Sequence, residues 1–321
     1  MSMQRRHDGS LRHLITLDGV PRAEVVALLD AAQAYVRRLG DAPPSNRSLA
    51  GVTIANLFTE PSTRTRVSFE LAGRRLGAEV VNLEVQLSSR VKGESMLDTV
   101  HTLESLHFDV FVIRDAEPGV VAHVAANVAP HVSVLSAGEA HLSHPTQGLL
   151  DALTIRQHKG EFARLRVAIV GDVRHSRVAR SAFEALTTLG VRELRLVAPR
   201  GLMPDPGEFP GCTRSASIDE GLDDIDVVMM LRIQKERMTE AAIPDGTEYF
   251  ARFGLTAPRL RRARPDAIVM HPQPMNRGIE IDSEVADGPQ SVIRDQVSNG
   301  VAVRMAVLQH VTRRGVAQGA A

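Results

Sequence analysis

The chain has 321 residues, which is enough for one large or two smaller α/β domains. Its 38 basic residues balance its 38 acidic residues, and aromatic residues make up only 3% of the sequence. This composition argues against a main function in gripping a nucleic-acid backbone or stacking on bases. The single cysteine, Cys212, excludes a disulfide within the chain and favours a reducing compartment.

Neither the N-terminal residues nor the apolar runs show a signal for export or membrane insertion. Residues 1–14 carry charges but lack the apolar segment of a signal peptide. The longest apolar runs, such as VVMML at 227–231, are too short to span a bilayer. We therefore expect a cytoplasmic protein that binds no membrane.

Strands and helices alternate along the first half of the chain. Strands are predicted at 51–58, 79–83, 109–114 and 131–136. Helices are predicted at 24–39, 64–77, 96–106, between the last two strands, and at 144–160. Near-continuous apolar strands that alternate with helices are typical of a parallel sheet.

The same alternation starts again after residue 160. Strands are predicted at 166–172, 193–199, 227–231 and 267–272, and helices at 177–190 and 298–314. The sequence therefore predicts an α/β fold with two open parallel-sheet domains, joined by the helix that ends near residue 159.

The segment FTEPSTRTR, residues 58–66, lies where a predicted strand leads into a helix, and its last five residues hold three hydroxyls and two arginines. A helix N-terminus offers unpaired N–H groups and a partial positive charge, and Ser62 and Thr63 stand where capping hydroxyls are found. With Arg64 they make a set of donors for a phosphate group. An ordinary capped helix is the alternative, although arginine in a first turn opposes the helix dipole.

The segment HPTQ begins with His144, at the end of the first half of the chain. The following proline holds this histidine in an extended conformation. A histidine that is satisfied within a helix-capping loop is the alternative interpretation. His141 lies three residues earlier, but no cysteine or intervening glutamate completes a metal site, so we expect no metal.

A polar loop, SSRVKGES at 88–95, contains Ser88 and Lys92. These side chains can close over an anion, and a merely solvated loop explains the sequence equally well.

Two loops in the second half carry donors at the ends of predicted parallel strands. GDVRHSR contains Arg177, and LRIQKER contains Arg232 and Gln234. Open α/β sheets bind ligands at the carboxyl ends of their strands, and arginine suits carboxylates. A dinucleotide site is a weaker interpretation, because the G-x-G-x-x-G spacing is absent.

The segment MHPQPMNRGIEI, residues 270–281, has two prolines that flank one residue. Such prolines stiffen a loop and leave its carbonyl groups pointing outward, where they can accept from an ammonium or amide. A rigid turn without a ligand is the alternative.

Taken together, STRTR, HPTQ and HPxP followed by EI, in this order and spacing, resemble the aspartate/ornithine carbamoyltransferase family over essentially the whole chain. Ornithine-type members carry HPCQ, HCLP and an SMG loop, whereas Thr146 and Pro272 occupy two of those places here. The resemblance is therefore to the aspartate-type members. It implies a carbamoyl phosphate-binding domain at 1–148, to which the C-terminal helix 298–321 returns, and an aspartate-binding domain at 149–297.

The resemblance also implies a role for each matching residue. Contacts to carbamoyl phosphate fall on Ser62, Thr63, Arg64, Thr65, Arg114, His144, Gln147, Pro272, Gln273 and Pro274. Contacts to aspartate fall on Lys92, Arg177, Arg232 and Gln234. The implied catalytic residues are Arg64, Thr65, Arg114, His144 and Lys92. Two residues, Ser88 and Lys92, would enter the site from a neighbouring subunit.

The implied reaction transfers the carbamoyl group to L-aspartate, an early committed step of pyrimidine synthesis. The resemblance implies a homotrimer that needs no cofactor or metal, with a dihydroorotase-like or regulatory chain considered as a further partner. Many members have a lysine in place of Val91, and enterobacterial-type members have threonine and leucine in place of Leu231 and Gln273. Two alternatives stay open: transfer to ornithine or an acylated ornithine, and a non-catalytic structural paralogue, against which the intact arginines and His144 argue.

Overall fold

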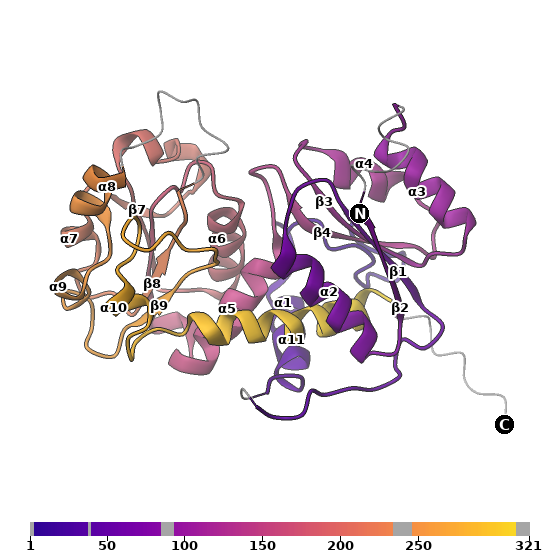
Figure 1. The fold of residues 1–321 in the computed structure, drawn as a ribbon, viewed down its shortest axis with the longest axis horizontal. Coiled ribbons are helices and arrows are strands. Elements are labelled where there is room, and N and C mark those ends of the chain that lie inside the picture. Colours follow the sequence, from indigo (N-terminus) through magenta and orange to yellow (C-terminus); the bar gives the residue numbers. More distant parts are fainter. Residues whose placement is uncertain (1–2, 38–39, 85–92, 234–245, 313–321) are drawn as a thin grey trace. The chain divides into compact units, whose positions relative to one another are not determined.

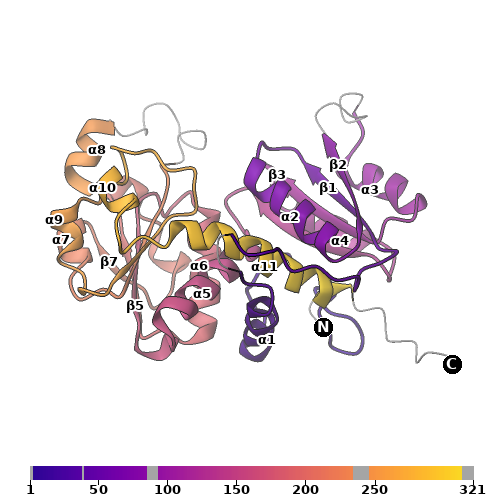
Figure 2. The ribbon, with the colours of Figure 1, turned by 60° about the horizontal axis from the view of Figure 1, so that its bottom comes forward.

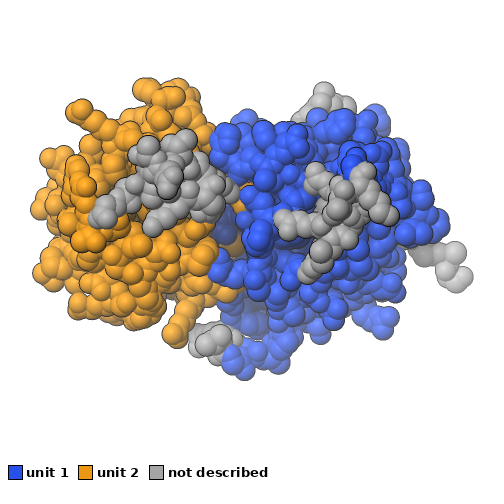
Figure 3. Space-filling view, turned by 45° about the horizontal axis from the view of Figure 1, so that its top comes forward, with its two compact units in different colours: residues 1–149, 298–321 blue, residues 150–297 orange. Residues whose placement is uncertain are grey.

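The computed structural model describes residues 3–37, 40–84, 93–233 and 246–312. The chain divides into two compact units, unit 1 (Met1–Leu149 with Ser298–Ala321) and unit 2 (Leu150–Val297), which Figure 3 colours separately. Each unit holds one parallel sheet, so the predicted α/β fold with two parallel sheets is confirmed. The division falls within helix α5 (Pro145–Lys159), and helix α11 (Ile293–Val311) returns the chain to unit 1.

The sheet of unit 1 has four strands in the order β2-β1-β3-β4. They are β1 (Thr53–Phe58), β2 (Glu79–Glu84), β3 (Val110–Asp115) and β4 (Ser133–Glu139). β1, β3 and β4 are buried along almost their whole length, because helices cover both faces. Helices α3 (Met96–Ser105) and α4 (Val120–Asn127) cover one face, and α2 (Thr63–Arg75) lies on the other (Figures 1 and 2).

The sheet of unit 2 has five strands in the order β7-β6-β5-β8-β9. They are β5 (Arg166–Val170), β6 (Glu193–Val197), β7 (Thr213–Ser215), β8 (Val227–Met230) and β9 (Ile268–Met270). Helix α6 (Arg177–Leu189) lies on one side of this sheet, and the short helices α7 (Ile218–Gly221) and α9 (Ala257–Leu260) lie on the other (Figures 1 and 2). The sequence did not predict β7, α7, α9, α8 (Gly246–Phe253) or α10 (Ser283–Ala286), because each is too short to show a period. No described helix is long and apolar enough to cross a membrane.

Helix α1 (Arg22–Gln33) ends six residues before the end predicted from its apolar spacing. The amides of Tyr35 and Val36 donate to carbonyls only three residues back, which tightens and ends the helix. The Tyr35 hydroxyl donates to Oε1 of Gln309 on α11. A tertiary contact therefore fixes this helix end, which the local sequence could not reveal.

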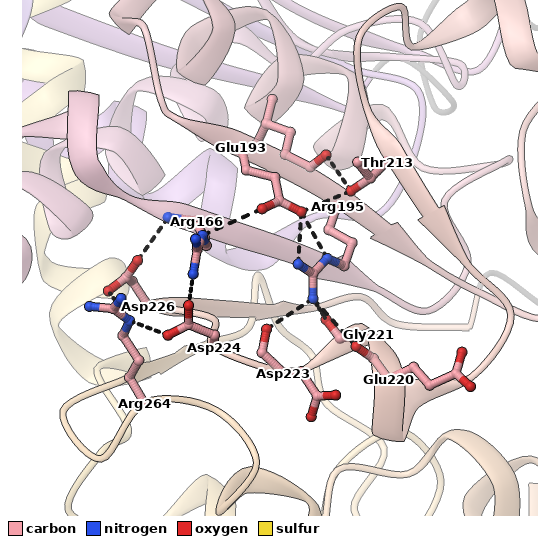
Figure 4. A network of polar contacts seen from close by, with 11 residues as sticks. Arg166, Glu193, Arg195, Thr213, Glu220, Gly221, Asp223, Asp224, Asp226 and Arg264 are labelled. Carbon is pink, nitrogen blue, oxygen red and sulfur yellow. Dashed lines mark hydrogen bonds and ion pairs between the residues drawn. The ribbon is translucent and has the colours of Figure 1, made fainter.

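The amino ends of the strands in unit 2 carry a network of charged side chains (Figure 4). Arg166, at the start of β5, forms ion pairs with Glu193 at the start of β6 and with Asp224. The carboxylate of Asp226, just before β8, accepts the Arg166 N–H at 2.8 Å and lies 3.5 Å from Arg264. These charges satisfy one another, so this edge of the sheet has a structural explanation and the opposite edge is where a ligand is expected.

The N-terminal segment extends the sheet of unit 1 beyond β4. Leu14 pairs in parallel with Leu135, and His13 beside it is fully buried. Nδ1 of His13 accepts the Val134 N–H at 2.9 Å. Burial, reinforced by the nearby Arg12 and Arg6 guanidinium groups, lowers the pKa of His13 to about 3.

This buried histidine should make the stability of the fold depend on pH. The unfolded chain binds a proton near pH 6.5 that folded His13 rejects until about pH 3. The free energy of unfolding should therefore fall as pH is lowered through this window, by up to about 1.4 kcal/mol per pH unit. Substituting His13→Asn should remove this part of the slope in urea unfolding, whereas His131→Asn, at an exposed histidine of the same unit, should not. Equal slopes in wild type and His13→Asn would contradict the assignment.

Candidate active site

Three segments of unit 1 reach the carboxyl edge of its sheet. They are the turn from β1 into α2, the end of β3, and the segment from β4 into α5. β1, β3 and β4 are parallel neighbours, and Phe58 pairs with Arg114 in register. Parallel pairing therefore gathers residues that are up to eighty positions apart in the sequence, Thr65 and His144 among them, at one edge.

Helix α2 begins at Thr63 without the features that normally stabilise a helix start. Ser62 occupies the N-cap position, where the sequence placed it, and its hydroxyl makes no capping hydrogen bond. The first turn contains no acidic residue and instead carries Arg64 and Arg66. Thr65 is buried while Arg64 is exposed. Backbone N–H groups, hydroxyls and a guanidinium at a positive helix end form a set of donors that suits an anion.

Arg114 lies at an irregularity between β3 and β4. Ile113 pairs with Ser136 but Asp115 pairs with Glu139, so β4 holds an extra residue beside Arg114. Nη1 of Arg114 donates to the Ala137 carbonyl at 3.2 Å.

A carboxylate that the sequence analysis passed over also holds this arginine. Oε2 of Glu60 lies 3.3 Å from Nε of Arg114. Glu60 is the one acidic residue in FTEPSTRTR, which is the signal that could have identified it. The pair fixes the direction of a guanidinium that is only 13% exposed.

His144 forms the start of helix α5. Its carbonyl accepts the N–H groups of Gln147 at 2.9 Å and Gly148 at 3.3 Å. His144, Thr146 and Gln147 are all buried. Buried polar side chains need hydrogen-bond partners, so this helix start gathers polar groups that can orient one another or a ligand.

In unit 2, the turns that follow β5 and β8 lie in contact. Gly171 has φ +126°, and a Cβ built there would lie only 2.9 Å from the Leu231 carbonyl oxygen. Only glycine fits this close approach. The contact holds the turn that leads to Arg177 beside the residue that precedes Arg232.

Arg177 is the first residue of α6 and is 4% exposed. The Ser176 hydroxyl caps this helix by accepting the Ala179 N–H at 3.1 Å. In the same turn, Oδ1 of the fully buried Asp172 lies 2.8 Å from Nδ1 of His175. Arg232 follows β8 and is half-buried. A buried guanidinium at a helix start opposes the dipole, as Arg64 does in unit 1, and both favour an anionic ligand.

The predicted proline loop follows β9, the neighbour of β8. Pro272 and Gln273 are half-buried and Pro274 is exposed. Gln273 has φ +56°, and its peptide bond to Pro274 is cis. Three further predicted site residues, Ser88, Lys92 and Gln234, lie outside the described residues.

The described residues also include the cysteine and side chains of the kinds that bind metals. Within residues 3–37, 40–84, 93–233 and 246–312, no group of three or more His, Cys, Asp or Glu side chains is placed to hold a metal ion. Burial raises the pKa of Cys212 to about 11, so its thiol stays protonated at neutral pH and is a poor nucleophile.

Comparison with protein families assigns both halves of the chain. Residues 12–157 match the carbamoyl-P binding domain of aspartate/ornithine carbamoyltransferase, and residues 163–311 match its Asp/Orn binding domain. The chain belongs to the aspartate/ornithine carbamoyltransferase family. The motifs that carried the resemblance in the sequence therefore identified the family correctly.

Solved structures of the family include enzymes for both acceptors. Aspartate transcarbamoylase from Trypanosoma cruzi, in complex with carbamoyl aspartate and phosphate, is 33% identical with TM-score 0.84, covering 94% of this chain and 96% of its own. Ornithine carbamoyltransferase from Thermus thermophilus is 27% identical with TM-score 0.82, covering 94% and 99%. The Pyrococcus furiosus ornithine enzyme is 29% identical with TM-score 0.81, covering 94% and 97%. The fold is thus common to both activities, and the acceptor has to be inferred from the residues.

The contact at Gly171 predicts a specific loss of stability. Gly171→Ala should lower the free energy of unfolding through both the strained φ and the collision with Leu231. Gly190→Ala is the matched control, because Gly190 also has positive φ (+78°) but open space around its Cβ. The control should lose about 1–2 kcal/mol and Gly171→Ala a further ~1–3 kcal/mol in denaturant unfolding. Equal losses would show that the two turns are not in tight contact.

Proposed function

We propose that this carbamoyltransferase carries the carbamoyl group from carbamoyl phosphate to the α-amine of L-aspartate, giving N-carbamoyl-L-aspartate and phosphate for pyrimidine synthesis. The observation that favours aspartate is the pair of arginines in unit 2. Arg177 and Arg232 follow the neighbouring parallel strands β5 and β8 at their carboxyl ends. Two guanidinium groups suit a dicarboxylate and repel the ammonium group of ornithine.

Unit 1 supplies the donors for carbamoyl phosphate in this proposal. Ser62, Thr63, Arg64 and Thr65 bind the phosphate at the start of α2, where no acidic side chain competes in the first turn. Arg114, held by Glu60 and the Ala137 carbonyl, bridges the phosphate and the carbamoyl oxygen.

The remaining contacts act on the carbamoyl group itself. His144, together with Thr65 and Arg114, polarises the carbamoyl carbonyl. Gln147 contacts the carbamoyl amide. The carbonyl groups of the loop Pro272–Pro274 accept from the incoming amine and from the carbamoyl amide, and Gln234 adds an aspartate contact.

The reaction then needs orientation and charge stabilisation rather than a covalent nucleophile. The neutral amine forms a bond to the carbamoyl carbon, and negative charge grows on the carbonyl oxygen. The C–O bond to phosphate breaks, and the departing phosphate takes the proton that the amine loses. Donors that are already aimed at the growing oxyanion each lower the barrier by ~3 kcal/mol.

We further propose that the enzyme is a homotrimer in which Ser88 and Lys92 enter a neighbouring subunit's site. Unit 1 exposes apolar side chains on one helix and one edge strand, which supports a contact between copies. Val67 and Leu71 lie one turn apart on α2, and Val81 lies on the edge strand β2, each between 38% and 41% exposed.

If aspartate is the acceptor, one arginine variant should change KM for aspartate and KM for carbamoyl phosphate by different amounts. Arg232→Ala should raise KM for aspartate about tenfold to hundredfold, because a charged hydrogen bond is lost, while KM for carbamoyl phosphate changes far less. Arg264→Ala, at the amino end of the same sheet, is the matched control and should leave both constants unchanged. The measurement is steady-state formation of carbamoyl aspartate. Formation of citrulline from ornithine by wild type would assign the other acceptor, and turnover of neither would indicate a non-catalytic paralogue.

The shared site predicts that two inactive variants restore activity together. Arg64→Ala and Lys92→Ala each leave every site of their own homotrimer incomplete. A mixed trimer has one intact site of three, and random 1:1 reassembly makes about three-quarters of trimers mixed, so about a quarter of wild-type activity should return. The variants must be dissociated and then reassembled together, with reassembled wild type as the control. A mixture that stays as inactive as its parents would place Lys92 within its own subunit's site or outside any site.

A further inference from the structure

The loop that contains Pro272–Pro274 is closed by two buried side chains. His271 ends β9 and begins the loop, and Glu280 ends it. Both side chains have 0% exposure, and Nε2 of His271 lies 3.2 Å from Oε1 of Glu280. The two ends of a ten-residue segment are thus joined by one polar contact inside unit 2.

The same pair receives two backbone amides of the loop. Nδ1 of His271 accepts the Gln273 N–H at 2.9 Å. A nitrogen that accepts carries no proton, so the ring proton sits on Nε2 and is donated to Glu280. Oε1 of Glu280 also accepts the Asn276 N–H at 2.5 Å. The ring and the carboxylate therefore hold the backbone on both sides of Pro274.

The pair is anchored to the parts of helices α11 and α5 that belong to unit 2. The His271 N–H donates to Oε1 of Gln296 on α11 at 2.9 Å. Nε2 of Gln296 in turn donates to Oδ1 of Asp151 on α5 at 2.9 Å. All of these side chains are buried. A continuous chain of hydrogen bonds thus connects Asp151 on α5 through Gln296 to the loop, and it sets the position of the loop.

The carbonyl groups of the loop are used differently from its amides. In the part of the chain that the structure describes, no donor bonds the carbonyl oxygen of Pro272, Gln273 or Pro274. The N–H groups of Gln273 and Asn276 donate to His271 and Glu280, whereas the three successive carbonyl groups can each accept from another donor. A buried polar pair is weak evidence for stability alone, because apolar residues of the same volume often serve as well.

We propose that His271 and Glu280 are positioning residues for carbamoyl transfer. They hold the Pro272–Pro274 carbonyls where the amine and the carbamoyl amide donate. The proposal rests on the proposed function, since it assigns these carbonyls to the reacting groups. Misplacing such a group by about 1 Å lowers the rate about 100-fold, so the hydrogen bonds of the pair should appear in kcat.

Glu280→Ala removes the acceptor for two donors, the buried His271 ring and the Asn276 N–H, and Glu280→Gln keeps one acceptor oxygen. The matched control is Asp226→Ala, which also removes a buried carboxylate that accepts a backbone N–H but lies at the amino end of the sheet. We expect Glu280→Ala to lower kcat about 100-fold with far less change in KM for carbamoyl phosphate. Glu280→Gln should recover most of the rate, and Asp226→Ala should keep wild-type kcat.

Hydrogen exchange provides a measurement that does not depend on activity. The amides of Gln273 and Asn276 should exchange faster in Glu280→Ala than in wild type or Asp226→Ala. If Glu280→Ala does not fold, His271→Asn replaces it, because asparagine can still accept from Gln273 but cannot reach Glu280. That variant should then show the loss of kcat and faster exchange at Asn276.

Each outcome has a definite consequence. Unchanged exchange in the loop would show that the pair does not hold it. Faster exchange with kcat equal to that of Asp226→Ala would make the pair purely structural and overturn the proposal. A wild-type enzyme that carbamoylates neither aspartate nor ornithine would instead contradict the proposed function and leave the exchange result standing.

Discussion

Both units place arginine at the start of a helix, and this constraint sets the electrostatics of each helix N-terminus. Arg64 and Arg66 stand in the first turn of α2, and Arg177 is the first residue of α6. The helix dipole makes each of these positions unfavourable for a cation by a few tenths of a kcal/mol up to about 1 kcal/mol. A bound anion reverses the sign of that interaction. Each unit therefore carries a helix start that an anionic substrate would stabilise.

The two edges of the second sheet have different roles. At the amino ends, three arginines and three carboxylates neutralise one another (Figure 4): Arg166, Arg195 and Arg264 with Glu193, Asp224 and Asp226. At the carboxyl ends, the turns after β5 and β8 approach so closely that only glycine fits at position 171. Internal neutralisation at one edge leaves the arginines of the other edge to define the electrostatics that a ligand meets. Because Arg264 and Asp226 lie at the amino edge, away from these arginines, variants at these two residues test for general effects of losing a charge.

Buried polar side chains mark the site more clearly than exposed charges do. His144, Thr146 and Gln147 at the start of α5, Asp172 after β5, and His271 with Glu280 after β9 are all buried at the ends or beginnings of regular elements. Apolar side chains would fill these positions at lower cost in desolvation. They lie beyond the carboxyl ends of strands, which is the edge at which open α/β sheets bind ligands.

The sequence by itself determined the fold class and the family. Continuous apolar strands separated by helices specify parallel sheets. The motifs STRTR, HPTQ and the proline loop could be recognised in the sequence because each lies within one short segment. Only the tertiary structure decided the strand order, the brief edge strand β7, and the early end of α1, where Tyr35 bonds Gln309. It also revealed that Glu60 holds Arg114 and that Glu280 holds His271. No periodicity in the sequence relates the members of these pairs, because the folded backbone brings them into contact.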